Sequence, residues 1–419
     1  MQTALPGKRL ALRLLAAWCL GAGLLAPHAP VWAQVAAPAT VAKAAAGPAG
    51  KKLLLRPGKK AAPAANAKAD QVADHPGSGN PRIVLFKSSA FPYDGLIPVE
   101  KKPFLDVVEP GGRRGHTSPR GGISWEDTTF SDRRTLLYVP KNFDIQKPGV
   151  IIVFFHGNQA TLGRDVMGRQ GVPQQVAESG LNAVLVAPQL AVNALDSSAG
   201  HFWDDGFFAR FLDEAATKLG EIQGAGSAEK FRAMPVVVVA YSGGYLPAIF
   251  ALEVGGAGGR VHGVILLDAL FGEVERYARW ISRHGGATFF FSAWSASSAE
   301  PNAQLRKQVS AAFPGLVNVL PPSLDAGTIA FQPSAGAIHN DFVTRAWIAN
   351  PLKAALSRVS EFRRAGSQPV AAPAAVAQPG KAAAPAASSG FPSFALPSLT
   401  APRPLDQQLA PPLDLRPDH

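Results

Sequence analysis

The chain has 419 residues, of which 47% are hydrophobic, enough to bury a sizeable core in one large domain or two ordinary ones. Much of the formal net charge of +11 comes from Lys and Arg in the flanks, so we interpret it as a solvated, solubilising surface and expect no nucleic-acid partner. The single cysteine, Cys19, lies near the N-terminus, which leaves the rest of the chain without a disulfide, a thiolate metal site or a cysteine nucleophile.

The N-terminus has the pattern of a secretory signal peptide over residues 1–33. The basic residues Lys8, Arg9 and Arg13 precede a short apolar run, and Ala33 offers a small residue for the signal peptidase. The run is too short for a comfortable bilayer span. We therefore expect cleavage and a periplasmic or secreted mature protein without a stable transmembrane segment, an uncleaved signal anchor being the alternative.

Two flanking segments share a composition that does not favour folding. Residues 34–80 are rich in Ala, Pro and Lys and lack apolar periodicity, so we expect an extended, mobile linker whose basic side chains make weak contact with an anionic envelope surface. Residues 365–419 repeat this composition and are expected to form a Pro/Ala-rich disordered tail. The expected folded domain is therefore 81–364.

Between the flanks, short apolar runs alternate with segments able to form helices. Most of these runs are continuously apolar, as expected of parallel strands buried on both faces. The alternation predicts an α/β fold with a doubly wound, mostly parallel central sheet flanked by helices. The expected strands are 135–139, 150–155, 183–187, 236–240, 263–267, 288–291 and 316–320, with antiparallel edge strands at 83–86 and 104–108. The expected helices are 207–219, 246–254, 273–283, 303–313 and 342–358.

The strongest local pattern places Ser242 between small residues, Ala240 and Gly244, where a buried strand runs into a helix. A turn this tight gives the serine strained backbone angles and brings its small neighbours together. At a helix N-terminus, backbone N–H groups also stabilise negative charge that develops near the serine. The pattern resembles the nucleophile elbow G-x-S-x-G of the α/β hydrolases, with Ala240 replacing the first glycine. A plain strand–turn–helix junction is the alternative.

A second pattern, His156-Gly157-Asn158, ends an earlier expected strand. In the superfamily that the elbow resembles, an HG dipeptide at the end of the third strand builds the oxyanion hole. The resemblance implies that the backbone N–H groups of Asn158 and Gly243 are the two oxyanion donors. Otherwise Gly157 only ends the strand and His156 is a satisfied polar residue.

His339 lies in a loop after the last expected strand and just ahead of the last helical run. This position matches the superfamily's chain order of serine, acid and histidine, so we interpret His339 as the general base. Among the nine histidines, His201 is the competitor, because it lies in the loop after 183–187 at the same edge of the sheet.

Two carboxylates compete for the role of the acid. Asp268 ends the strand that follows the nucleophile strand, whereas the superfamily's more usual position is one strand later, where Glu300 is the nearest carboxylate. We favour Asp268, because a carboxylate at the C-terminal end of a parallel strand is rarely core filling. A structural role in capping the following helix is the alternative for Asp268.

The resemblance covers about residues 130 to 360 and implies a serine hydrolase. It implies that Ser242 attacks a carboxylic ester or amide and forms an acyl-enzyme, with proton transfer through His339 and with Asp268 orienting the imidazole. The expected substrate is a small-molecule or lipid-like acyl compound. No cofactor or metal is expected, because no metal-ligand spacing or phosphate-binding loop is present in the sequence.

Side chains near these motifs are candidates for substrate binding. The loop 189–205 leaves the same edge of the sheet and carries His201 and Trp203, and Tyr245 follows the elbow. We expect these three residues to contact substrate, although aromatic residues are more often part of a core. Two other functions fit the sequence: an acyltransferase acting on an envelope glycan or lipid, and a non-catalytic envelope-binding protein that uses its basic flank.

Overall fold

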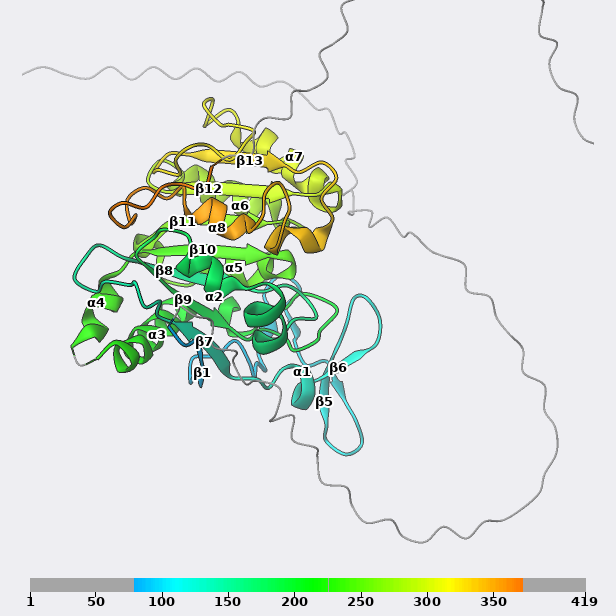
Figure 1. Ribbon diagram of the computed structural model, residues 1–419. Coiled ribbons are helices and arrows are strands. Elements are labelled where there is room, and N and C mark those ends of the chain that lie inside the picture. The colour runs from blue at the N-terminus through cyan, green and yellow to red at the C-terminus, as the bar shows by residue number, and fades with distance from the viewer. Residues whose placement is uncertain (1–78, 225, 372–419) are drawn as a thin grey trace, which may run out of the picture. The chain divides into compact units, whose positions relative to one another are not determined.

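A computed structural model describes residues 79–224 and 226–371, so the expected signal peptide, nearly all of the linker and most of the tail lie outside the described residues. Within the described residues, a central eight-stranded sheet is covered by helices on both faces (Figure 1). The predicted α/β fold is confirmed. The strands of this sheet are β1 (Arg82–Leu85), β7 (Arg134–Tyr138), β8 (Val150–Phe155), β9 (Ala183–Pro188), β10 (Val236–Tyr241), β11 (Val261–Leu267), β12 (Phe289–Trp294) and β13 (Ile329–Pro333).

The strands are arranged in the order β1-β7-β9-β8-β10-β11-β12-β13. All pairs from β9 to β13 are parallel, whereas β1 and β7 form an antiparallel edge. The sheet is therefore mostly parallel, and the C-terminal ends of its parallel strands lie along one edge. The helices are α1 (Glu126–Thr129), α2 (Val172–Ala177), α3 (Phe207–Gln223), α4 (Ser227–Ala233), α5 (Tyr245–Glu253), α6 (Val274–His284), α7 (Ala299–Val309) and α8 (Pro351–Leu356).

The sheet has a separate hydrophobic core on each face. Val236 and Val238 of β10 belong to the core under helices α3, α5, α6 and α7. Val237 and Val239 belong to the opposite core, which includes α2 and α8. Successive side chains of a strand point to opposite faces, so a strand covered on both sides must be apolar at every position. This requirement explains the run of four valines in β10.

The last strand of the sheet differs from the prediction. The segment 316–320 makes only one parallel bridge, Val317 to Ala330, and the strand is β13 instead. Val319 is 55% exposed, and two prolines follow the segment and cannot donate ladder hydrogen bonds. The segment therefore runs beside β13 without continuing as a strand.

Two other predicted elements were wrong. The helix expected at 342–358 is divided into a 3₁₀ turn, His339–Val343, and the short helix α8. Asn350 has a left-handed backbone (φ +56°) just before Pro351, and that conformation ends any helix arriving from the N-terminal side. The edge strand expected at 104–108 is reduced to the two residues of β4, which do not belong to the main sheet.

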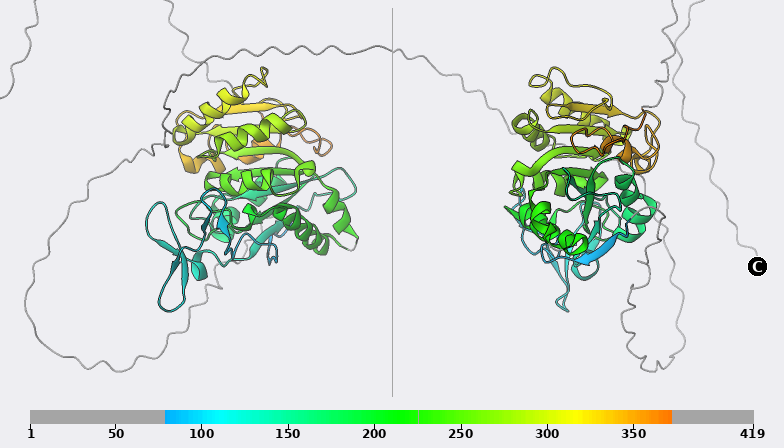
Figure 2. Two further views of the ribbon diagram at one scale, coloured as in Figure 1. Left: turned by 180° about the vertical axis from the view of Figure 1, so that it is seen from behind. Right: turned by 60° about the vertical axis from the view of Figure 1, so that its left-hand side comes forward.

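Smaller sheets lie beside the main one. Strands β4 (Val107–Val108), β5 (Arg114–Thr117) and β6 (Ile123–Trp125) form an antiparallel ribbon that projects from the body (Figure 2). Strands β2 (Leu96–Ile97) and β3 (Lys102–Pro103) form a two-stranded sheet. No helix among residues 79–224 and 226–371 combines the length and the apolar character needed to cross a bilayer.

Candidate active site

Ser242 follows the last residue of β10 and begins a 3₁₀ turn, Ser242–Gly244, that leads into α5. Its backbone is left-handed, with φ +54°, a conformation that costs a non-glycine residue free energy and recurs at functional sites. A Cβ atom on Gly157 would lie 2.6 Å from Ser242 Cβ, so the loop after β8 approaches the serine closely. The sharp turn thereby presents the Ser242 hydroxyl at the C-terminal edge of the sheet.

The parallel register brings the polar ends of three strands together. Ala240 of β10 is paired with Phe155 of β8, and Tyr241 is paired with Leu267 of β11. The residues that follow these pairs, including His156 and Asp268, therefore emerge beside Ser242. This placement follows from strand order alone, because neighbouring parallel strands end at the same edge.

Ser242, His339 and Asp268 form a continuous hydrogen-bonded chain. Ser242 Oγ lies 2.7 Å from His339 Nε2, and His339 Nδ1 lies 2.7 Å from Asp268 Oδ2. A carboxylate only accepts hydrogen bonds, so Nδ1 carries the proton and Nε2 is free to accept from the serine hydroxyl. The structure thus brings together the three residues expected from the sequence as nucleophile, base and acid.

Asp268 is completely buried, with 0% of its surface exposed, and is itself left-handed at φ +44°. Burial raises the pKa of the Asp268 carboxyl, but hydrogen bonds from His339, Ser298 and Ser295 outweigh it and hold the pKa below its ordinary value. Asp268 is therefore ionised, and its carboxylate accepts the hydrogen bond from His339 Nδ1. Glu300, the alternative acid, is exposed in the first turn of α7, and His339 pairs with Asp268 instead.

Two aromatic rings contact the imidazole of His339. Tyr241 stacks on it, with ring centroids 5.1 Å apart and an interplanar angle of 20°, and Phe271 meets its edge at 5.6 Å. The Tyr241 hydroxyl also lies 3.3 Å from the His339 carbonyl oxygen, to which it donates. Burial raises the pKa of Tyr241 to about 12, so this phenol stays neutral. The sequence did not identify the contact, because Tyr241 and His339 are far apart in the chain.

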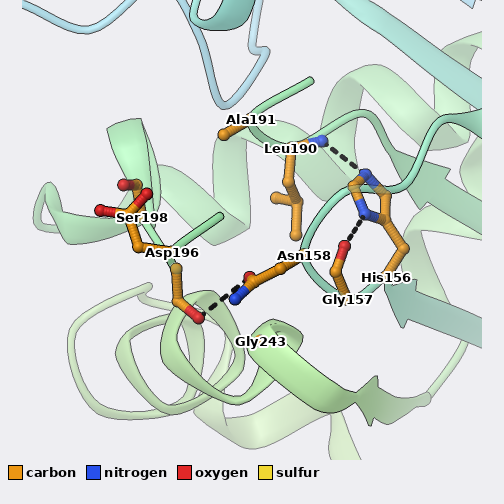
Figure 3. Close-up of a pocket in the computed structure, with 9 residues that line it drawn as sticks. His156, Gly157, Asn158, Leu190, Ala191, Asp196, Ser198 and Gly243 are labelled. Carbon is orange, nitrogen blue, oxygen red and sulfur yellow. Dashed lines mark hydrogen bonds between the residues drawn. The ribbon is translucent and has the colours of Figure 1, made fainter. Parts of the chain in front are cut away.

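A polar pocket of about 10 Å³ adjoins the two expected oxyanion donors, Asn158 and Gly243 (Figure 3). Asn158 N–H has no hydrogen-bond partner among residues 79–224 and 226–371. Gly243 N–H lies at the start of a helical turn, where no helical acceptor is available. The Asn158 side-chain oxygen accepts a hydrogen bond from Ser197 and contacts the Gly243 backbone so closely that a Cβ atom has no room there. Both amides therefore remain available beside Ser242.

His156 holds the loop that carries Asn158. Its Nδ1 lies 2.8 Å from the Gly157 carbonyl oxygen and its Nε2 accepts from the Leu190 N–H at 2.9 Å (Figure 3). Because the C=O and N–H of a trans peptide point in opposite directions, the bond to Gly157 directs the Asn158 N–H away from the His156 ring. Burial lowers the pKa of His156 to about 4, so the ring is neutral and keeps both hydrogen bonds.

The three residues expected to bind substrate have other partners. His201 pairs with Asp204 at 2.7 Å and packs on aromatic rings, and it contacts neither Ser242 nor His339 among the contacts found in the described residues. Trp203 is buried against Tyr93 and Phe104 as part of the core.

Tyr245 is linked to His339 only indirectly, through Phe271. Its ring is tilted against Phe271, which contacts His339, and its carbonyl oxygen accepts from Tyr277. Five other residues of the loop 189–205 line the pocket: Leu190, Ala191, Asp196, Ser197 and Ser198. No group of three or more His, Cys, Asp or Glu side chains within the described ranges is arranged to hold a metal ion.

A mostly parallel sheet carries a strand–turn–helix serine at its C-terminal edge, with the acid and the histidine following in chain order. The chain has the α/β-hydrolase fold.

No family model matches this hydrolase-fold chain, and no curated protein matches it. Solved structures that resemble it include the feruloyl esterase module from Clostridium thermocellum, at 14% identity over 65% of this chain and 98% of that one, with a TM-score of 0.36. Esterase 2 of Thermogutta terrifontis gives 14% identity over 50% and 81% of the two chains, with a TM-score of 0.32. The esterase rPPE gives 15% identity over 58% and 79%, with a TM-score of 0.34.

Proposed function

We propose that this protein is a serine hydrolase that cleaves a carboxylic ester through an acyl-enzyme on Ser242. The observation that carries the proposal is the pair of 2.7 Å contacts joining Ser242 Oγ, His339 and the buried carboxylate of Asp268. A serine hydroxyl becomes an effective nucleophile when an adjacent base accepts its proton and a third group orients that base.

The geometry supports a definite order of proton transfers. Ser242 Oγ attacks the substrate carbonyl carbon while its proton moves to His339 Nε2, and the negative charge collects on the carbonyl oxygen. The N–H groups of Asn158 and Gly243 would donate to that oxygen, each contributing about 3 kcal/mol in comparable sites. The imidazolium, stabilised by Asp268, then protonates the departing alkoxide. Water then attacks the acyl-serine while His339 takes one of its protons, and His339 passes that proton to Ser242 Oγ as the carboxylic acid leaves.

Exposed apolar side chains beside His339 support a substrate with an apolar part. Phe271 is 39% exposed although its ring meets the His339 imidazole, and Ile338, the residue before His339, is 62% exposed. An apolar acyl or alcohol group packed there would bury surface on both sides. We therefore favour a small-molecule or lipid-like acyl ester.

Hydrolysis of p-nitrophenyl acetate and butyrate tests the proposed function. We expect Ser242→Ala and His339→Ala to lower kcat by about 10⁴-fold or more, and Asp268→Asn by about 10⁴-fold because the His339 tautomer is no longer fixed. Glu300→Gln is the matched control, and its kcat should stay within about twofold. Equal loss in Glu300→Gln and Asp268→Asn would overturn the assignment of the acid.

We also propose that the protein is exported, on the basis of residues 1–33, which lie outside the described residues. The basic start and short apolar run support a cleaved signal peptide. N-terminal sequencing of the protein recovered from its native cells should begin close to residue 34. A sequence that begins at Met1 would contradict export by this route.

A further inference from the structure

Asp268 accepts an unusual number of hydrogen bonds from one short segment. The Ser295 N–H and the Ser298 hydroxyl donate to Oδ1, the former at 2.9 Å. The hydroxyls of Ser295 and Ser297 donate to Oδ2 at 2.7 and 3.1 Å, beside the contact from His339 Nδ1. Each carboxylate oxygen is thus held by at least two donors, and three of the five donors are serine hydroxyls.

The sheet explains why these serines reach Asp268. Strands β11 and β12 are parallel neighbours with Leu267 opposite Ala293, so the residues that follow each strand meet, and the Asp268 N–H donates to the Ala293 carbonyl at 2.7 Å. The segment 295–298 enters α7, and its donors turn inward. It occupies the place after β12 where the superfamily more usually carries its acid.

Buried polar contacts hold the segment from the other side. Asn302 of α7 is fully buried, donates to the Ser298 carbonyl at 2.8 Å and accepts from the Ser292 hydroxyl at 2.6 Å. A side chain with both groups satisfied in this way has little freedom to move. The backbone of Ser298 is therefore held in place by a buried side chain.

We propose that Ser295, Ser297 and Ser298 are positioning residues that keep the Asp268 carboxylate ionised and turned toward His339. The inference rests on the proposed function, since Asp268 matters only if His339 acts on Ser242. A buried carboxylate without donors takes up a proton to avoid the cost of a desolvated charge. A protonated Asp268 no longer stabilises the imidazolium. By keeping Asp268 ionised, the serine hydroxyls support proton transfer from Ser242 to His339.

Hydrogen-bond donors are the main reason why the Asp268 carboxyl stays ionised. Two titratable groups interact with it directly: His339, which is hydrogen-bonded to the carboxylate, and Tyr241, whose pKa the Asp268 charge raises. Tyr241 is neutral because burial raises its pKa to about 12. No Lys or Arg is among the main influences on the pKa of the Asp268 carboxyl, which is lowered by hydrogen bonds against the effect of burial.

Carbon-13 NMR of the Asp268 carboxyl measures the inferred effect without relying on activity. Full-length protein would carry labelled aspartate, and the signal would be assigned by its loss in Asp268→Asn. We expect the pKa of Asp268 to rise by about one unit or more in the double variant Ser295→Ala, Ser298→Ala. Ser298→Thr, which keeps a hydroxyl, should restore the wild-type value relative to Ser298→Ala. Ser334→Ala is the matched control, because it removes a buried hydroxyl that makes no hydrogen bond within the described residues.

The pH profile of kcat/KM supplies the second readout. In the double variant kcat/KM should fall more steeply on the acid side as Asp268 takes up a proton, with KM for p-nitrophenyl butyrate unchanged, because the serines do not touch the substrate. If the double variant does not fold, Ser297→Ala, at an exposed residue, should give a smaller shift of the Asp268 pKa in the same direction. An unchanged Asp268 pKa in a folded variant would overturn the inference. An inactive wild type with a shifted pKa would instead count against the proposed function.

Discussion

The backbone around Ser242 is closely packed because its glycine neighbours have no side chains. A Cβ atom on Gly157 would lie 2.6 Å from Ser242 Cβ and 3.1 Å from its Oγ, and Gly244 lies against the Phe155 carbonyl. These close approaches fix where the hydroxyl points, because no side chain intervenes between the loop after β8 and the serine. The position of the Ser242 hydroxyl thus depends on the glycines at 157 and 244 as well as on its polar partners.

Gly157→Ala tests this crowding at a position that carries no reactive group. The added methyl must displace the Ser242 side chain, and a displacement of about 1 Å is expected to lower kcat/KM by about 100-fold. The variant should still fold, as shown by an unchanged circular dichroism spectrum. Gly286→Ala is the control, since a Cβ atom there meets nothing within 4 Å. Full activity in Gly157→Ala would show that the serine is not held by this contact.

The sequence predicted which residues form the candidate site, but it did not predict most of the contacts between them. Ser242 and His339 were predicted from a local motif and from chain order, and Asp268 from its place at a strand end. The serines around Asp268 and the ring of Tyr241 on His339 were not predicted, because each contact joins segments that are distant in the chain. Only the parallel register of β10, β11 and β12 brings them together.

The loop between β8 and the helical segment Leu162–Arg169 depends on a neutral imidazole. His156 donates from Nδ1 to Gly157 and accepts at Nε2 from Leu190, an arrangement that a doubly protonated ring cannot make. Burial lowers the pKa of His156 to about 4 from its ordinary 6.5. Between pH 6.5 and 4, His156 therefore stays neutral in the folded protein but is protonated in the unfolded chain.

Stability should consequently fall as the pH is lowered from 6.5 to 4. The contribution of His156 is complete above its ordinary pKa and is lost by pH 4, a difference of about 3 kcal/mol in the free energy of unfolding. Asp268 acts in a different window, because its pKa lies below the ordinary 3.8 and its contribution is lost only under more acid conditions. Urea unfolding of wild type and His156→Gln at pH 7.5 to 4 measures the difference. Parallel curves for the two proteins would contradict this account.

At the scale of the elements, continuous apolar runs predicted most strands correctly. The run 150–155 coincides with β8, and 236–240 falls one residue short of β10. The prediction was wrong at 316–320, where apolar composition resembles a strand but the edge of the sheet was taken by Ile329–Pro333. Which of two apolar segments pairs with an edge strand is decided by tertiary packing, and local composition does not contain that information.

At the scale of the whole molecule, the net charge is concentrated in one segment of the sequence, residues 34–78. Residues 34–78 contain seven basic and two acidic side chains, which supply +5 of the net charge of +11. All residues of the candidate site lie between 79 and 371. Catalysis and attraction to anionic surfaces should therefore be separable.

Deleting residues 34–78 tests this separation. We expect kcat/KM for p-nitrophenyl butyrate to stay within about twofold, while binding to vesicles with anionic headgroups weakens and loses most of its salt dependence. Flotation at two salt concentrations measures the binding. Undiminished, salt-sensitive binding after the deletion would place the anionic contact on the folded domain.

The central claim is that Ser242 is an activated nucleophile, and labelling with a fluorophosphonate tests it most directly. The purified protein should be modified once, at the peptide that contains Ser242, as located by mass spectrometry. Ser242→Ala should not be labelled, and His339→Ala should be labelled far more slowly because its serine has lost the base. A folded wild-type protein that resists the probe, or that is labelled at another serine, would contradict the account.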